Sequence, residues 1–248
     1  IWIGGQSGLA CWEKGALSQY GKSHGLTDKR IVSIFETLDG KIGAATWGGV
    51  FFLEGKRFTY VGVKNGLVFN FVFGGLADRE GNIWLATHLG VSCLRTLGVV
   101  NYSTRHNLSH DTVFCTAWDR TGRTWFATAE GVCYLEKGKI KRIRQDKAFS
   151  VRSIHALVID RDGTVWAGTP AGLGYISGNR LRYLPPYKEN IFELVKRKNG
   201  GFWIASNKGV YFLKDRRVTR FEGPDYPLSV STVMEDSKGD LWFAAPGT

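Results

Sequence analysis

The stretch VFCTAWDRTGRTWFAT (113–128) places the tetrapeptide DRTG between two apolar runs that are rich in β-forming residues. An Asp can fold its side chain back onto the amides of a tight turn, and a Gly readily adopts the positive φ that such a turn needs. The stretch therefore predicts an antiparallel β-hairpin. DRDG (160–163) also suggests a calcium loop, but the Asp-rich spacing and the distant Glu of such a loop are missing.

Copies of this hairpin recur along the whole chain. The anchor residue that follows each turn returns after 41, 41, 41, 41, 37 and 39 residues, and a Gly stands three positions before every anchor from the second onward. Self-similarity at this period indicates a repeat architecture in which the Trp residues belong to the scaffold. The anchors are Trp2, Gly43, Trp84, Trp125, Trp166, Trp203 and Trp242.

Each repeat continues beyond the hairpin with a second turn and two more apolar runs, such as VFFLEG (50–55) and KRFTYVG (56–62). Every unit therefore predicts four short antiparallel strands, and no helical period interrupts them. Repeated about seven times, this unit predicts an all-β fold: a β-propeller of four-stranded antiparallel blades, with about six to seven blades.

The composition narrows the class of protein. Hydrophobic residues make up 43% of the chain and aromatic residues 13%, which suffices for a packed core and disfavours disorder. The net charge of +11 favours anionic partners. The local basic cluster KGKIKRIRQDK (137–147) lacks the interleaved aromatic residues of a nucleic-acid stripe, so no nucleic-acid partner is expected.

One full unit reads HGLTDKRIVSIFETLDGKIGAATWGGVFFLEGKRFTYVGVKNGL (24–67). It resembles the two-component regulator propeller repeat, whose pattern includes a GL turn, a D-x-x-G turn and a closing F-x-x-Y. The resemblance extends over essentially the whole chain. Two departures are Gly43, which replaces an anchor Trp, and Arg197, which replaces the turn Asp.

The resemblance implies a non-enzymatic, ligand-sensing propeller from the periplasmic or extracytoplasmic part of a bacterial membrane receptor. It implies oligosaccharide, acidic oligosaccharide included, or another small anionic ligand as the partner, and a kinase or cyclase output domain outside this chain. No cofactor and no metal are expected. The membrane is expected to be a partner only through the parent receptor, and a homodimer is compatible with the sequence.

The order of the strands suggests an incomplete ring. The chain opens inside a repeat and ends inside another, so we expect residues 1–248 to form a single propeller domain that is a fragment of a longer receptor. Five complete blades and a partial blade at each end are expected. Seven blades are favoured for the full ring.

Loops that precede the innermost strand and turns between the second and third strands share one face of a propeller, around the mouth of its channel. Recognition is expected in such loops, because the strands carry stability. Trp47 stands out, since it lies in a turn of the blade that lacks the anchor Trp. The candidate ligand-binding residues are Trp47, Arg30, His88, Arg105, His110, Arg152, Tyr187 and Lys208.

Several alternatives stay open at the level of sequence. Trp47 either offers a stacking platform for a sugar ring or base, or packs into the space left by Gly43. The chain could also be a protein-interaction scaffold, or a glycan lyase or hydrolase built on a propeller. An enzyme would need converging acids or a base, and no spacing links Asp111, Glu130 and Glu193.

Overall fold

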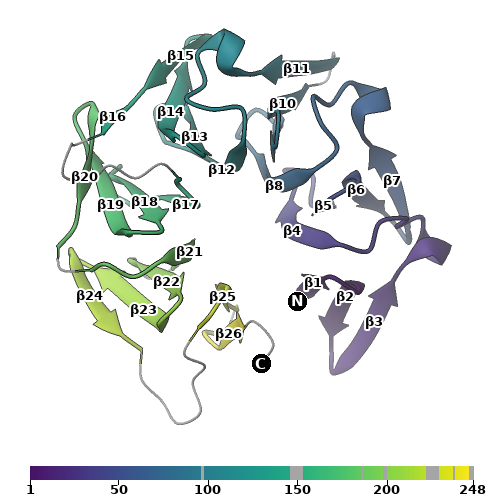
Figure 1. Ribbon diagram of the computed structural model, residues 1–248. Coiled ribbons are helices and arrows are strands. Elements are labelled where there is room, and N and C mark those ends of the chain that lie inside the picture. The colour runs from purple at the N-terminus through teal and green to yellow at the C-terminus, as the bar shows by residue number, and fades with distance from the viewer. Residues whose placement is uncertain are drawn as a thin grey trace. The chain divides into compact units, whose positions relative to one another are not determined.

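The computed structural model describes residues 1–95, 98–145, 153–185, 187–197, 200–221, 229–236 and 238–245. The chain divides into two compact units, Ile1–Thr116 (unit 1) and Ala117–Thr248 (unit 2), and the boundary falls within strand β12. Strands dominate both units, and the three short 3-10 helices found among the described residues lie in unit 1 (Figure 1).

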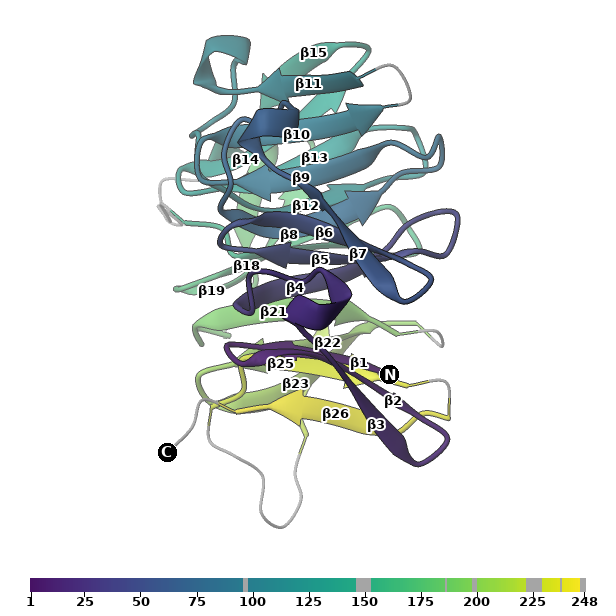
Figure 2. The same cartoon turned by 90° about the vertical axis from the view of Figure 1, so that its right-hand side faces the viewer.

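Unit 1 consists of antiparallel sheets whose strands follow one another in chain order. Three strands form blade 1 (β1–β3), four form blade 2 (β4–β7) and four form blade 3 (β8–β11), which Figure 2 shows from the side. A 3-10 turn leads from each blade to the next. The elements are β1 (Trp2–Gly5), β2 (Gly8–Glu13), β3 (Ala16–Tyr20), η1 (Lys22–His24), β4 (Ile31–Glu36), β5 (Ile42–Thr46), β6 (Gly49–Glu54), β7 (Arg57–Val61), η2 (Val63–Asn65), β8 (Val72–Ala77), β9 (Ile83–Thr87), β10 (Gly90–Arg95), β11 (Gly98–Tyr102), η3 (Thr104–His106) and β12 (Val113–Trp118).

The remaining strands continue the same plan. Blade 4 comprises β12–β15, blade 5 comprises β17–β20 with the additional strand β16 at its outer edge, blade 6 comprises β21–β24, and blade 7 comprises β25 and β26. The strands are β13 (Thr124–Thr128), β14 (Gly131–Glu136), β15 (Lys139–Arg142), β16 (Arg144–Gln145), β17 (Ala156–Ile159), β18 (Val165–Thr169), β19 (Gly172–Ser177), β20 (Arg180–Tyr183), β21 (Ile191–Lys196), β22 (Phe202–Ser206), β23 (Gly209–Lys214), β24 (Arg217–Arg220), β25 (Thr232–Glu235) and β26 (Leu241–Ala244).

These successive four-stranded antiparallel sheets are the blades of a β-propeller, which confirms the fold class predicted from the repeats. The second strand of a blade is its most buried part: β13, β18 and β22 are buried at every residue. The fourth strand alternates instead, as in β20, where Leu181 is buried between two exposed arginines. A hydrophobic core therefore runs through the inner strands and a polar rim follows the outer ones.

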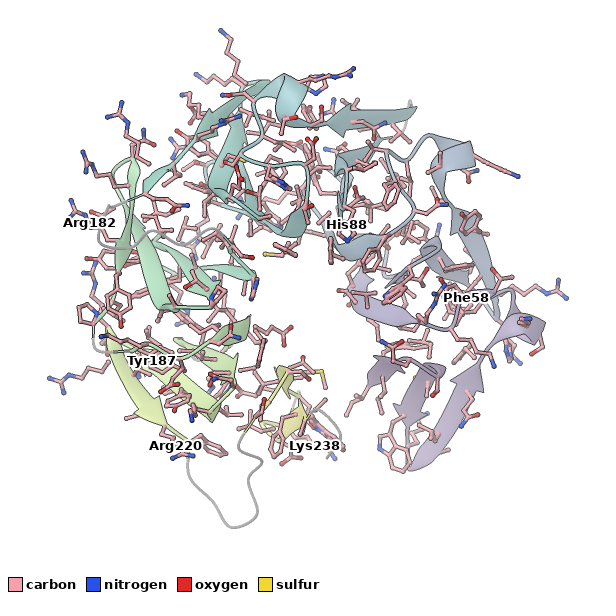
Figure 3. The ribbon with its side chains drawn as sticks, viewed as in Figure 1. Phe58, His88, Arg182, Tyr187, Arg220 and Lys238 are labelled. Carbon is pink, nitrogen blue, oxygen red and sulfur yellow. The ribbon has the colours of Figure 1, made fainter. Side chains whose placement is uncertain are left out.

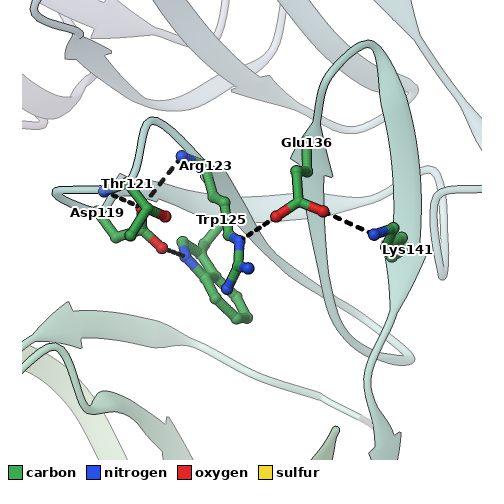
Figure 4. Close-up of polar contacts among 6 residues, drawn as sticks. All are labelled: Asp119, Thr121, Arg123, Trp125, Glu136 and Lys141. Atoms are coloured by element: carbon green, nitrogen blue, oxygen red, sulfur yellow. Dashed lines mark hydrogen bonds and ion pairs between the residues drawn. The ribbon is translucent and has the colours of Figure 1, made fainter. Parts of the chain in front are cut away.

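The predicted Asp-x-x-Gly turn is present in detail in blade 4 (Figure 4). Gly122 has a φ of 84°, and one carboxylate oxygen of Asp119 accepts the backbone N–H of Thr121 at 2.8 Å and of Arg123 at 3.1 Å. The other oxygen accepts the indole N–H of Trp125 at 2.9 Å. Burial opposes the charge, but the hydrogen bonds from Thr121 and Trp125 hold the pKa of Asp119 below its usual range. The turn carboxylate thus satisfies the buried anchor Trp.

Ion pairs fasten this turn to the outer strands. Arg123 pairs with Glu136 of β14 at 2.5 Å, and Lys141 of β15 pairs with the same carboxylate at 2.6 Å (Figure 4). The Arg123 guanidinium also lies 5.1 Å from the ring centroid of Tyr134. These contacts therefore connect the turn to β14 and β15, the two outer strands of blade 4.

A buried hydroxyl fixes the second turn of blades 2 to 6. The side-chain oxygen of Thr128 donates to the carbonyl of Gly131 at 2.9 Å and accepts the N–H of Glu130 at 3.1 Å. Because buried polar groups need partners, this pair of bonds explains why Thr or Ser stands three residues after the anchor. Equivalent bonds involve Thr46, Thr87, Thr169 and Ser206, all fully buried.

Blades 2 and 6 each contain a residue that departs from the repeat pattern, and each compensates for it in its own way. Phe35 of β4 fills the space beside Gly43, since a Cβ on Gly43 would lie 2.3 Å from the ring of Phe35. In blade 6, Arg197 stands where the turn Asp is expected, and Glu235 of β25 supplies the missing carboxylate. It pairs with Arg197 at 2.5 Å and accepts the indole N–H of Trp203 at 3.0 Å.

Candidate functional site

The candidate site lies in unit 1 and begins at Arg30, just before β4. The Arg30 guanidinium donates to both carboxylate oxygens of Asp28, at 3.0 and 3.1 Å, and the Arg30 backbone N–H donates to the same side chain at 3.0 Å. Partial burial opposes the charge of Asp28, but these bonds hold its pKa below the usual range and raise the pKa of Arg30. The guanidinium is thereby held 4.9 Å from the ring centroid of Trp47.

Trp47 projects from the turn between β5 and β6. The hydroxyl oxygen of Thr46 accepts the backbone N–H of Gly48 at 3.0 Å, and the Tyr60 hydroxyl donates to the Gly48 carbonyl at 2.9 Å. These two bonds hold the turn in place. The Trp47 side chain is nevertheless 47% exposed. A rigid turn therefore presents a large aromatic face to solvent.

The structure excludes one of the two interpretations of Trp47, that it packs into the space left by Gly43. Phe35, not Trp47, fills the space beside Gly43, and it packs edge-on against Phe52 at 5.9 Å. The ring of Trp47 instead contacts Phe71 of the next blade, with centroids 5.1 Å apart. Compensatory packing at Gly43 is thus not the role of Trp47.

Aromatic contacts continue from Trp47 into blade 3. His88, in the turn between β9 and β10 and labelled in Figure 3, lies 5.0 Å from Phe71 and 4.9 Å from Phe73. Phe73 then lies 5.1 Å from Phe114 of β12. These residues, together with Phe69 at 6.3 Å from His88, are called the aromatic ladder: Trp47, Phe69, Phe71, Phe73, His88 and Phe114.

A β-bulge sets the direction of the Phe73 side chain in the aromatic ladder. The pairing of β8 with β9 shifts between Val72 and Gly74, so Phe73 has no direct partner across the sheet. A bulge bends its strand and redirects the extra side chain, which here meets His88. The same shift occurs between Ile31 and Ser33 in β4, where the extra residue is Val32.

Sequence reasoning found Trp47 and His88 but missed the phenylalanines between them. The available signal was the alternation of Phe69, Phe71 and Phe73 directly after the NGL turn. Alternate residues of an extended chain share one face, so three such rings line up on one side. The pattern was hidden because it straddles a loop and the start of a strand.

The other candidates in unit 1 lie around η3. Arg105 is exposed within it, and the Nδ1 of His110 accepts the backbone N–H of Thr112 at 2.9 Å. Thr112 also donates to the carbonyl of His88 at 3.3 Å, which links this loop to the ladder. Asp111 is occupied in holding η3, because it accepts the N–H of Thr104 at 2.6 Å.

The three remaining candidates belong to unit 2. Tyr187 departs from the expectation of an exposed loop residue: it is 8% exposed, packs edge-on against Tyr211 at 4.9 Å, and has a raised pKa because it is buried. Its large apolar ring is more favourably placed in the core than in water. Lys208 is exposed beside Ser206, and Arg152 lies outside the described residues.

Two shallow grooves lie at the first turn of blade 2 (residues 37–40), where Thr37 takes the place of the turn Asp, with volumes of about 630 and 740 Å³. Lys41 is common to both and pairs with Asp39 at 3.3 Å and Glu54 at 3.2 Å. Neither groove is lined by a ladder residue, so they are separate features of unit 1. Within the described ranges, no group of three or more His, Cys, Asp or Glu side chains could hold a metal ion.

Comparison with known proteins agrees with the β-propeller fold. Residues 149–171 match the family described as "Two component regulator propeller". This stretch is similar to a two-component regulator propeller repeat. The match confirms the resemblance predicted from the repeats, and blade 5 is the part of the chain that carries it. No curated protein matches the chain.

Solved structures with the same fold include signalling receptors. The extracellular domain assigned to the hybrid two component system BT3049 of B. thetaiotaomicron superposes with a TM-score of 0.81 at 17% identity, over 98% of this chain and 36% of that one. The extracellular domain assigned to BT4673 of the same organism gives 0.81 at 18%, over 98% and 37%. The chain thus spans about a third of the length of these two structures.

The same fold also occurs in an enzyme. A streptogramin B lyase structure superposes with a TM-score of 0.76 at 13% identity, over 96% of this chain and 84% of that one. At such identities the likeness shows the β-propeller fold and nothing of the chemistry. No helix of the described residues has the length and apolar character needed to cross a membrane.

Proposed function

We propose that this chain is a non-enzymatic, ligand-sensing propeller that binds an oligosaccharide on the aromatic ladder. The observation that supports this best is the exposed ring of Trp47, which a hydrogen-bonded turn holds in place. Phe71 contacts Trp47, and His88 in turn contacts Phe71, which extends the aromatic surface. Exposed large aromatics that form a contiguous surface mark binding sites more often than scattered ones do.

The chemistry of the ladder favours ring stacking over charge recognition. The charge of Arg30 is already paired with Asp28 in a two-bond contact, so its guanidinium adds a flat cationic surface beside Trp47 but little net charge. A row of aromatic faces with polar groups at its margin is typical of small-molecule sites. Sugar rings of an oligosaccharide would lie along it.

The receptor context supports a sensing role. Extracellular domains of signalling systems share the fold of this chain, and the chain spans about a third of their length. We therefore propose that residues 1–248 act as one propeller domain in the extracytoplasmic part of a longer membrane receptor. Its kinase or cyclase output domain would lie outside this chain.

Calorimetry with a panel of neutral and acidic oligosaccharides tests the proposal. We expect micromolar to millimolar binding, about −8 to −4 kcal/mol, and we expect Trp47→Ala to weaken it roughly tenfold, in line with the loss of one stacking platform. Trp12→Ala is the matched control, because Trp12 is 40% exposed on β2 but lies outside the ladder.

The outcomes separate the alternatives. Equal effects of the two Trp substitutions, or no binding by any oligosaccharide, would reject the ladder as the site. Product formation from any bound glycan would show a lyase or hydrolase instead.

A further inference from the structure

The outer edge of blade 5 carries a feature that the other blades lack among the described residues. The short strand β16 leaves blade 4 and pairs in parallel with β20, with Arg144 opposite Arg180 and Gln145 opposite Leu181. The N–H of Arg144 also donates to the carbonyl of Asn179 at 3.0 Å. The end of the basic cluster at 137–147 thus pairs with β20, which is also basic.

Four exposed arginines lie at this edge: three come from the paired strands, and Arg216 comes from the turn between β23 and β24. Arg180 and Arg182 lie on one face of β20, on either side of the buried Leu181, and Figure 3 labels Arg182. Tyr175 of β19 pairs with Arg182, and the Arg216 guanidinium lies 4.8 Å from the Tyr175 ring centroid. The arginine face is defined by Arg144, Arg180, Arg182 and Arg216 around Tyr175.

Positive charges stand close together on the arginine face. Like charges that stand directly opposite each other in a sheet are unfavourable, and Arg144 stands opposite Arg180. In the part of the chain that the structure describes, none of the four arginines forms an ion pair with a carboxylate. Arg123 of blade 4, by contrast, is paired with Glu136. An external anion would relieve the repulsion.

We propose that the arginine face binds a linear sulfated polysaccharide. Guanidinium groups recognise oxyanions through paired, charge-assisted hydrogen bonds. Alternate residues of a strand are about 7 Å apart, so Arg180 and Arg182 form a row that can follow charges along an extended chain. This site is in unit 2 and goes beyond the proposed function of the ladder in unit 1.

Two other polyanions fit the face less well. Insertion into an anionic membrane surface uses exposed apolar side chains. Among the described residues of blades 5 and 6, which carry the arginine face, no large hydrophobic residue is exposed. Single-stranded nucleic acid uses successive open aromatic platforms, whereas the ring of Tyr175 is already covered by Arg216.

Calorimetry of the full chain with a dextran sulfate fragment, at about 0.15 M salt, tests the proposal. We expect binding that weakens with added salt, and no binding of unsulfated dextran of the same length. The double variant Arg180→Gln/Arg182→Gln is expected to bind at least about tenfold more weakly, which corresponds to about 1.4 kcal/mol. Arg216→Gln provides a second variant and is expected to weaken binding in the same direction.

The control removes the same amount of charge elsewhere. Lys56→Gln/Arg57→Gln changes two exposed basic residues at the outer strand of blade 2 and is expected to leave dextran sulfate binding nearly unchanged. Equal weakening by both double variants would reduce the effect to net charge and overturn the proposal. Binding of unsulfated dextran, tighter binding to vesicles of anionic phospholipid, or no binding at all would also overturn it.

Discussion

Asp119 shows how a single side chain holds a blade together. Its carboxylate accepts two backbone N–H groups of the turn and the indole N–H of Trp125, which is only 4% exposed. The same bond recurs between Asp78 and Trp84 at 2.8 Å. In blade 5 it does not, and within the described residues the buried indole N–H of Trp166 has no partner. The repeat therefore tolerates the loss of one such bond.

Replacing Asp119 by Ala is expected to lower the free energy of unfolding by about 1–3 kcal/mol, because a buried donor loses its acceptor. The lowered pKa of Asp119 means that its contribution is present above the unfolded pKa of about 3.9 and is lost as the pH falls through the folded pKa. Denaturant unfolding at pH 7 and pH 3 measures both effects. Glu80→Ala, in the exposed turn of blade 3, should cost much less; a similar cost would contradict this account.

Glu193 behaves in the opposite sense. Burial raises the pKa of this carboxyl group, although it accepts hydrogen bonds from Thr232 at 2.5 Å and from the N–H of Val233 at 3.1 Å. Glu193→Gln keeps an acceptor and removes the charge, so we expect the unfolding free energy at pH 7 to rise by about 1 kcal/mol or more.

The pH dependence provides the check on this second prediction. As the pH falls, folded Glu193 takes up its proton before the unfolded chain does, so the natural chain gains stability until the pH nears the unfolded pKa of about 4.3. The advantage of the Gln variant should thus disappear at about pH 4. A difference that does not change with pH would argue against a charge effect.

At the scale of elements, β25 is fastened to blade 6 by side chains. Glu235 of β25 pairs with Arg197 and accepts the indole N–H of Trp203, while Glu193 of β21 bonds to β25 from the other side. The short two-stranded blade 7 is therefore attached by polar contacts as well as by packing around Val233. Arg197 can replace the turn Asp because Glu235 of β25 supplies the carboxylate that accepts the indole N–H of Trp203.

A double-mutant cycle of Arg197→Ala and Glu235→Ala measures this attachment. We expect a coupling free energy of about 1–3 kcal/mol, since the pair is half-buried and makes two hydrogen bonds at 2.5 and 3.0 Å. The exposed pair Lys41 and Glu54, at 3.2 Å, serves as the control and should couple by less than about 1 kcal/mol. Equal couplings for the two pairs would show that burial contributes nothing here.

At the scale of the whole molecule, two surfaces of different chemistry lie in different units. The aromatic ladder of unit 1 offers ring faces and little net charge, whereas the arginine face of unit 2 offers charge and no open ring. Part of the net charge of +11 is thus concentrated on the arginine face.

We expect the two surfaces to respond independently. Trp47→Ala should weaken the oligosaccharide that stacks on the ladder and leave dextran sulfate binding unchanged, and Arg180→Gln/Arg182→Gln should do the reverse. The combined variant should show the sum of the two losses, because no residue is shared between the surfaces. Calorimetric titration of the three variants with both ligands measures this, and a loss of both affinities in one single-surface variant would refute independence.

The sequence was most informative about the repeat. Turn chemistry at Asp119 and Gly122, and the alternation in the strands, are local signals within a few residues, so the blades and the fold class could be predicted from them. The candidate site was predicted only in part. Trp47 and His88 were found from their turn positions; Tyr187 lies in the expected loop, but its side chain is buried in the core.

The amino-acid sequence by itself determined the four-stranded unit, its period and its turns, because each depends on hydrogen bonds between neighbours in the chain. Only the tertiary structure decided that Phe35 fills the space at Gly43, that Trp47 meets Phe71, and that Arg144 lies against Arg180. Those contacts join residues from different strands or blades. Their geometry depends on how sheets pack and how strand edges pair, which no local pattern encodes.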